Sequence, residues 1–231
     1  MRPIVLTALF ILPWAASAAE EEEAQAAFAN VRTRTFSLAS VDAATVSSAR
    51  LYVSQDDGGT WRQAQELRGG AGEALTFSFT AEQDGSYGFM TAVNFSDGHG
   101  DAEPRPGEAP QVRVVIDTAA PVIELFQVRL EARVGDKANL RVSWAVADAN
   151  PGLVIIEGAT QGGEDYSELA RAGSRGNQQL TLSVPAAALQ AQVRVVAEDR
   201  AGNRTVGSPQ TVELPPATTT AAETEGAAAM R

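Results

Sequence analysis

His99 is the only histidine in the sequence, and it lies in the segment DGHGD, residues 97–101. Imidazole suits general acid–base chemistry near neutral pH, and Ser96 with a neighbouring acid would complete a hydrolytic triad. A triad needs groups that packed elements hold rigidly, whereas these residues share one Gly-rich loop. We therefore expect His99 to be a solvated loop residue.

Other reactive groups are scarce. The chain has no Cys, which excludes thiol nucleophiles, disulfides and Cys-ligated metal sites. Its 29 acidic residues could include the two opposed carboxylates of a glycoside hydrolase, but the sequence places no pair at that spacing. No phosphate-binding loop or dinucleotide fingerprint is present. We expect no enzymatic activity and no organic cofactor.

The charge of the chain restricts its partners. Acidic residues outnumber basic ones by 29 to 18, and the net charge is −11. Such a surface repels the phosphates of nucleic acids. We expect no nucleic-acid binding, and we expect the partner to be a protein or a component of the cell envelope.

Residues 1–19 have the organisation of a Sec signal peptide. Arg2 supplies the positive charge, residues 4–12 the apolar core, and ASA at 16–18 the cleavage site. The apolar stretch is shorter than the about 20 residues that span a bilayer, so we expect no transmembrane anchor. The mature chain is predicted to start near Ala19 and to be secreted or periplasmic. Export without disulfides suggests a bacterial source.

The rest of the chain shows the two-residue periodicity of strands. Leu75, Phe77 and Phe79 alternate with polar residues, which is the pattern of a strand half buried on a core. The same alternation is found at residues 87–95, 112–116, 140–146, 180–184 and 193–197. Convincing helical periodicity is almost absent, so the pattern predicts an all-β protein in which each half has its own core.

Two changes of composition divide the chain. The segment DTAAP at residues 117–121 contains a proline and small residues, which favour a boundary. We predict domains at residues 28–117 and 121–214. Residues 215–231 are Thr, Ala and Glu in low complexity, too poor in large apolar groups to offset their ordering entropy, and are predicted to be disordered.

Several segments resemble immunoglobulin-like and fibronectin type III domains of secreted bacterial proteins. LRVSWAVADANPG (140–152) is similar to their second strand, with its inward Trp, and AQVRVVAEDRAGN (191–203) to their sixth strand and the hairpin after it. DTAAPVIEL (117–125) is similar to the linker that opens such domains. The resemblance implies spacing, adhesion or support of a neighbouring module, and no particular chemistry.

The first half shows the same likeness in DGSYGFMTAVN (84–94), where Tyr87 occupies the position of a tyrosine corner. Its opening strand is hard to find before Val31, so we expect an incomplete first sheet. The fold class is therefore predicted to be all-β, with two tandem immunoglobulin/fibronectin type III-like β-sandwiches.

One motif in the first half resembles the Asp box S-x-D-x-G-x-T-W. Its fixed positions are Ser54, Asp56, Gly58, Thr60 and Trp61. The Asp carboxylate can accept backbone N–H groups across a hairpin turn, Gly tolerates positive φ, and Trp can pack beneath. We expect a structural turn, and a binding role is the alternative.

The resemblance also suggests a calcium site. In such a sandwich, loops of the second domain lie at the end where the chain enters, so oxygen ligands from both predicted domains could meet there. The candidate ligands are Asp84, Asp117, Asp148, Asp199 and Asn203. The alternative is that these residues are turn formers that satisfy local N–H groups.

These inferences favour an exported, non-catalytic interaction or structural protein at or outside the cell surface. The alternative is a carbohydrate-binding accessory module of an extracellular hydrolytic system, suggested by the Asp box and loop aromatics. Sugar platforms need exposed aromatic faces, and we assign Trp61 and Trp144 to cores. Tyr52 and Tyr166 are then the aromatic residues to mutate in a test of sugar binding.

Overall fold

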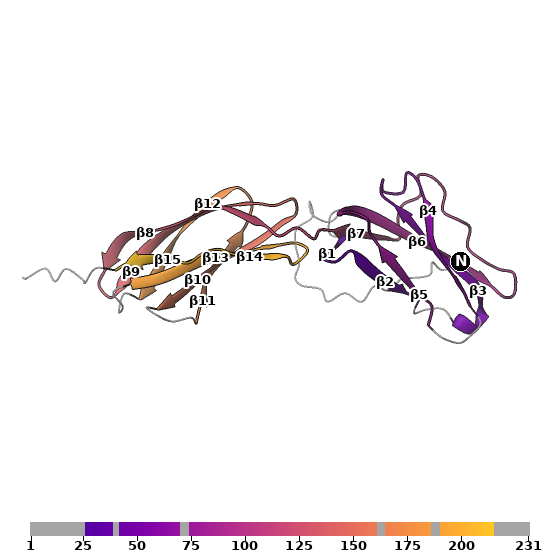
Figure 1. Ribbon diagram of the computed structural model, residues 1–231, viewed down its shortest axis with the longest axis horizontal. Helices are drawn as coiled ribbons and strands as arrows, with labels where there is room; N and C mark the ends of the chain where they lie inside the picture. Colours follow the sequence, from indigo (N-terminus) through magenta and orange to yellow (C-terminus); the bar gives the residue numbers. More distant parts are fainter. Residues whose placement is uncertain (1–25, 39–41, 70–73, 161–164, 186–189, 215–231) are drawn as a thin grey trace, which may run out of the picture. The chain divides into compact units, whose positions relative to one another are not determined.

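The computed structural model describes five segments of the chain (Figure 1). They are residues 26–38, 42–69, 74–160, 165–185 and 190–214. The predicted signal peptide and the predicted C-terminal tail lie outside these segments. No helix in the described residues is long and apolar enough to cross a bilayer.

The chain divides into two compact units. Unit 1 comprises Met1–Ala119 and Arg200–Asn203, and unit 2 comprises Ala120–Asp199 and Arg204–Arg231. Apart from one short 3-10 turn, η2 (Ala43–Thr45), the regular elements of the described residues are strands. The protein is all-β, as the alternation of its sequence predicts.

The described residues of unit 1 form seven strands in two sheets (Figure 1). They are β1 (Ala26–Ala29), β2 (Thr33–Ser37), β3 (Val46–Ser54), β4 (Arg62–Arg68), β5 (Thr76–Thr80), β6 (Gly85–Phe95) and β7 (Val112–Ile116). One sheet has the order β1-β7-β6-β3-β4, and β2 pairs with β5 in the other.

The opening strand of unit 1 explains its incomplete sheet. β1 begins at Ala26, ahead of the predicted domain start at residue 28, and runs parallel to β7 in the five-stranded sheet. The sheet formed by β2 and β5 therefore has only two strands in the described residues. Two strands alone are marginal in water, so this sheet depends on the face that it packs against.

Aromatic residues fill the interior of unit 1. The rings of Phe36 and Phe89 lie 4.5 Å apart between centroids, and those of Phe79 and Phe89 lie 5.1 Å apart with an edge-on geometry. Phe36 and Phe79 come from the two-stranded sheet, and Phe89 comes from β6 of the other sheet. Aromatic pairs thus join the two layers.

The outer face of β6 is buried as well, which the sequence did not predict. Met90 is 7% exposed and Ala92 is 2% exposed, although they point away from the aromatic core. The side chain of Asp101 accepts a hydrogen bond from the Val93 amide, and that of Gln111 accepts one from the Thr91 amide. Hydrogen bonds thus tie the long polar connection from β6 to β7 to the edge of β6, although most of its residues are exposed.

In the part of unit 2 that the structure describes, eight strands form two sheets (Figure 1). They are β8 (Val122–Val134), β9 (Lys137–Ala147), β10 (Pro151–Thr160), β11 (Ser167–Gly173), β12 (Asn177–Pro185), β13 (Gln190–Asp199), β14 (Arg204–Val206) and β15 (Gln210–Glu213). β12-β9-β8 form one sheet, and β11-β10-β13 with β14 and β15 form the other. The two sheets form the β-sandwich that the sequence predicts for this half of the chain.

The core of unit 2 surrounds one large side chain. Trp144 is 1% exposed, as the sequence predicts, and it belongs to a cluster with Leu140, Val154, Ile156 and Val195. These residues come from both sheets. Each unit thus has a hydrophobic core of its own.

Candidate functional site

The turn between β3 and β4 is built by the motif that begins at Ser54. Asp56 Oδ1 accepts a hydrogen bond from the Thr60 amide at 2.8 Å, and Asp56 Oδ2 accepts one from the Thr60 hydroxyl at 2.8 Å. The Ser54 hydroxyl donates to Asp56 Oδ1 and accepts from the Gly58 amide. One carboxylate and one hydroxyl thus organise the whole turn.

The backbone of this turn explains its glycine. Asp57 has φ 55° and Gly58 has φ 95°, both in the left-handed region. A Cβ at Gly58 would also collide with the carbonyl group of Glu108. The amide of Thr60 and the hydroxyls of Ser54 and Thr60 lower the pKa of Asp56, which keeps this carboxylate ionised.

Trp61 does not occupy the position that we predicted. It is half-buried and is absent from the core cluster of unit 1, so its assignment to a core is wrong. Its indole Nε1 is buried, and no residue in the described segments accepts a hydrogen bond from it. The reason is positional, because Trp61 follows the turn and precedes β4, at the rim of the sandwich.

Trp61 lines a pocket of about 330 Å³ next to the turn. Buried side chains of Phe79 and Tyr87 contribute to its lining, together with exposed Arg62 and Glu82. The pocket therefore lies between the β3–β4 hairpin and the end of β5. Sequence reasoning missed it, since Arg62 and Glu82 are 20 residues apart and neither belongs to a recognisable motif.

Tyr87 forms the corner that the sequence predicts. Its hydroxyl donates to the carbonyl of Gln83 at 2.7 Å, and its ring is 1% exposed. This bond fixes the turn that leads from β5 into β6, and with it the lining of the pocket on that side.

Neither tyrosine chosen for a test of sugar binding offers a free ring. Tyr52 is 5% exposed, and burial raises the pKa of its phenol. The guanidinium of Arg194 covers the ring of Tyr166 at 3.8 Å from its centroid, and the Tyr166 hydroxyl bonds to Gln192. That choice of residues is therefore wrong.

The predicted calcium ligands of unit 1 have bonds within their own unit. The Asp84 carboxylate accepts hydrogen bonds from the amide and hydroxyl of Thr118, and it pairs with Arg32 at 3.1 Å. These donors lower the pKa of Asp84. The buried carboxylate of Asp117 accepts from the Ala119 amide, and its carbonyl accepts from Asn203 Nδ2.

The other predicted ligands belong to unit 2. Asp148 and Asp199 have carboxylate oxygens within 4.8 Å of each other, and Asp199 is 5% exposed. Asp148 also accepts a hydrogen bond from the Asn150 amide, as a turn former does. Calcium binding by these residues stays a prediction from the sequence.

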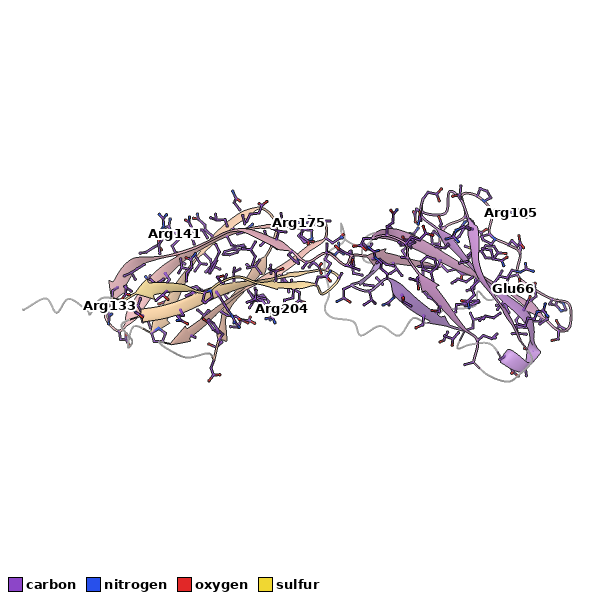
Figure 2. All side chains as sticks on the ribbon, in the orientation of Figure 1. Glu66, Arg105, Arg133, Arg141, Arg175 and Arg204 are labelled. Carbon is purple, nitrogen blue, oxygen red and sulfur yellow. The ribbon has the colours of Figure 1, made fainter. Side chains whose placement is uncertain are left out.

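Some of the acidic residues pair with arginines. Glu157 of β10 pairs with Arg194 at 2.7 Å and with Arg204 at 3.6 Å, and Figure 2 labels Arg204. His99, the candidate base, has a side chain that is 80% exposed, with Asp97 3.3 Å from its Nδ1. In the described residues this histidine thus stands in solvent, without the packed support of a general base.

Comparison with known proteins yields structural likeness alone. No protein-family model and no curated protein matches the chain. The FN1-FN3 domains of chicken CNTN1 superpose with a TM-score of 0.47 and 11% identity, over 83% of this chain and 62% of that one. Fibronectin(III)-like modules of CbhA from Clostridium thermocellum superpose with a TM-score of 0.43 and 15% identity, over 82% of this chain and 87% of that one. The glycoside hydrolase domain of Endo-D from Streptococcus pneumoniae superposes with a TM-score of 0.36 and 15% identity, over 79% of this chain and 31% of that one.

Proposed function

We propose that this chain is an exported, non-catalytic interaction or structural protein that acts at or outside the cell surface. Its two units are closed β-sandwiches of the fibronectin type III kind, and their interiors are filled by apolar side chains. Folds of this type carry function on loops and strand edges.

One observation supports the non-catalytic part of the proposal above all. Several carboxylates that could act as acids or bases stabilise turns and strand pairs instead. Asp56 organises a hairpin, Asp84 bonds to Thr118, and Glu157 pairs with arginines. Such groups are already engaged, so they are poorly placed to act as acids or bases on a substrate.

Unit 2 is the better candidate for contact with a protein partner. It has six of the seven large hydrophobic side chains that are exposed in the described residues: Val122, Leu125, Val134, Leu153, Leu169 and Val206. Unit 1 has one, Val31. Exposed apolar side chains favour association when a partner covers them.

Affinity capture with the mature chain as bait tests this function. Envelope and medium fractions are compared on three baits: the native chain, a Val122→Lys/Val134→Lys variant of unit 2, and a Val31→Lys control in unit 1. We expect a component that the native chain and the control retain and that the unit 2 variant loses. Hydrolysis of model esters or glycosides that His99→Ala or one acid substitution abolishes would instead establish an enzyme.

Export has its own test. N-terminal sequencing of the protein recovered from periplasm or medium should read from Ala19, because residues 16–18 form the predicted cleavage site. Recovery of the chain only from the cytoplasm, with Met1 retained, would contradict export.

The carbohydrate-binding alternative gains one observation from the structure. Trp61 lies beside a pocket instead of in a core, so an aromatic side chain is available to a ligand after all. The Tyr52 and Tyr166 rings do not provide this, since the first is buried and the second is covered by Arg194.

A further inference from the structure

The pocket beside Trp61 has the size of a small-molecule site. Its volume of about 330 Å³ lies at the lower end of the roughly 300–1,000 Å³ that such sites occupy. A site this small has room for one compact ring and excludes a helix or a folded protein segment.

Its charged residues have no partner of their own within the described residues. Arg62 is the first residue of β4, and Glu82 lies in the turn before β6. Neither the guanidinium of Arg62 nor the carboxylate of Glu82 forms a hydrogen bond or an ion pair with a described residue. By contrast, Asp84 pairs with Arg32, and Arg113 of β7 pairs with Asp57. Arg62 and Glu82 can therefore donate to and accept from a ligand.

The remaining lining indicates a ligand with hydroxyl groups and an apolar face. Trp61 supplies an indole, whose Nε1 has no acceptor in the described part of the chain. Gln55, Thr60 and Thr80 supply amide and hydroxyl groups around it.

The charge of the site indicates a neutral ligand. Arg62 and Glu82 cancel each other, and the whole chain has a net charge of −11, which disfavours acidic sugars. A hexose ring combines several hydroxyls with an apolar C–H face that packs against aromatic rings.

We propose that this pocket binds one neutral hexose unit of a glycan. Trp61 packs against the apolar face of the ring, while Arg62 and Glu82 hydrogen-bond to its hydroxyls. This inference rests on the proposed non-catalytic binding function, and it gives that function a ligand class and a place in unit 1.

Saturation-transfer NMR on the mature full chain tests the proposal. The probes are glucose, galactose, mannose and N-acetylglucosamine, each alone, followed by an array of neutral glycans. We expect at least one probe to receive saturation transfer and its affinity to fall about tenfold in Arg62→Ala and in Glu82→Gln, because each variant removes a charge-assisted hydrogen bond. Arg68→Ala, an exposed change at the other end of β4, is the matched control and should bind as the native chain does.

Every result of the binding experiment either supports or overturns the sugar site. All three substituted residues are exposed, so thermal unfolding should show the native Tm and exclude loss of fold as the cause. Absence of transfer to every probe and every array glycan, or equal binding by Arg62→Ala and Glu82→Gln, would overturn the sugar site. Binding that Arg68→Ala weakens as strongly would overturn it too.

The same samples separate this inference from the proposed function. If the sugar is cleaved or isomerised in the NMR tube, the non-catalytic function fails while the site stands. If no sugar binds but affinity capture still retains a partner through unit 2, the site fails and the interaction function stands.

Discussion

The two units place their opening strands on different sheets. In unit 2, β8 runs antiparallel to β9 and completes a three-stranded sheet. In unit 1, β1 pairs with β7 instead, and it leaves β2 and β5 as a pair. The core of unit 1 is correspondingly rich in aromatic residues, while that of unit 2 is aliphatic around Trp144. The difference suggests that a smaller sheet is held by larger side chains.

Both units protect a strand edge in the same way. In unit 2, the Oε1 atom of the Gln210 side chain accepts a hydrogen bond from the Val128 backbone N–H, and its Nε2 donates one to the Phe126 carbonyl of β8. In unit 1, the Gln65 side chain accepts from the Ser78 amide of β5. A side chain from the opposite sheet thus satisfies backbone groups that would otherwise attract another strand.

Truncation of a core side chain should have the largest effect on stability, and it should destabilise only the unit that contains the substituted residue. Phe89→Ala removes the ring that joins both layers of unit 1, and Trp144→Ala removes the centre of the unit 2 core. Each should cost about 3–5 kcal/mol of its own unit's free energy of unfolding. NMR-monitored thermal unfolding reads both units at once, with Val206→Ala, an exposed change, as the control. Equal destabilisation of both units by either variant would contradict separate cores.

The tyrosine corner gives the next effect, and unit 2 has no tyrosine in β13 to match it. Tyr87→Phe keeps the ring and removes the hydrogen bond to the Gln83 carbonyl, which should cost about 0.5–1.5 kcal/mol in urea unfolding. Tyr166→Phe in unit 2 removes a bond near the surface and should cost less. A larger loss for Tyr166→Phe than for Tyr87→Phe would reverse this ranking.

Alternation in the sequence predicts well which face of a strand meets a core, and it predicts poorly whether the opposite face is buried too. Phe77 and Phe79 are buried while Thr76 and Thr80 are exposed, because one face of β5 meets a core. Alternation does not predict that Met90 and Ala92, on the second face of β6, are buried as well.

The sequence also fails to predict the short strand β1 and the position of Trp61. The four residues of β1 are too few for a period to appear, and their partner β7 is distant in sequence. Trp61 was misassigned because hydrophobic type alone does not distinguish a core from a pocket wall. The turn at Asp56, by contrast, was predictable because its hydrogen bonds are local.

Acid should destabilise unit 1 more than unit 2. Hydrogen bonds from Thr60, Arg113 and Thr118 lower the pKa values of three carboxyls in unit 1, Asp56, Asp57 and Asp84. In unit 2, the hydrogen bond from Arg171 lowers the pKa of Glu168. A lowered pKa stabilises the fold above the ordinary value, about pH 4 for Asp, and this stabilisation is lost as pH falls further.

Thermal unfolding between pH 6 and pH 3 measures this difference. These groups are exposed, so the effect should be modest, and salt should weaken the Arg pairs more than the turn at Asp56. Asp56→Asn should flatten the pH profile of unit 1 and leave that of unit 2 unchanged. Parallel profiles for the two units would contradict the expected contrast.

Calcium should produce the smallest effect, and only on unit 2 if Asp148 and Asp199 bind it. We expect a small rise in the Tm of unit 2 with added calcium, reversed by chelator and absent in Asp148→Asn. Calorimetry without heat, together with a Tm that chelator does not change, would dispose of this prediction.

The interiors of the two units form separately. The most direct measurement is the NMR spectrum of residues 120–214 expressed alone, overlaid on that of the full mature chain. We predict dispersed amide resonances, with those of β9, β10 and β13 at the same positions in both spectra. A collapsed spectrum typical of an unfolded chain would contradict the account.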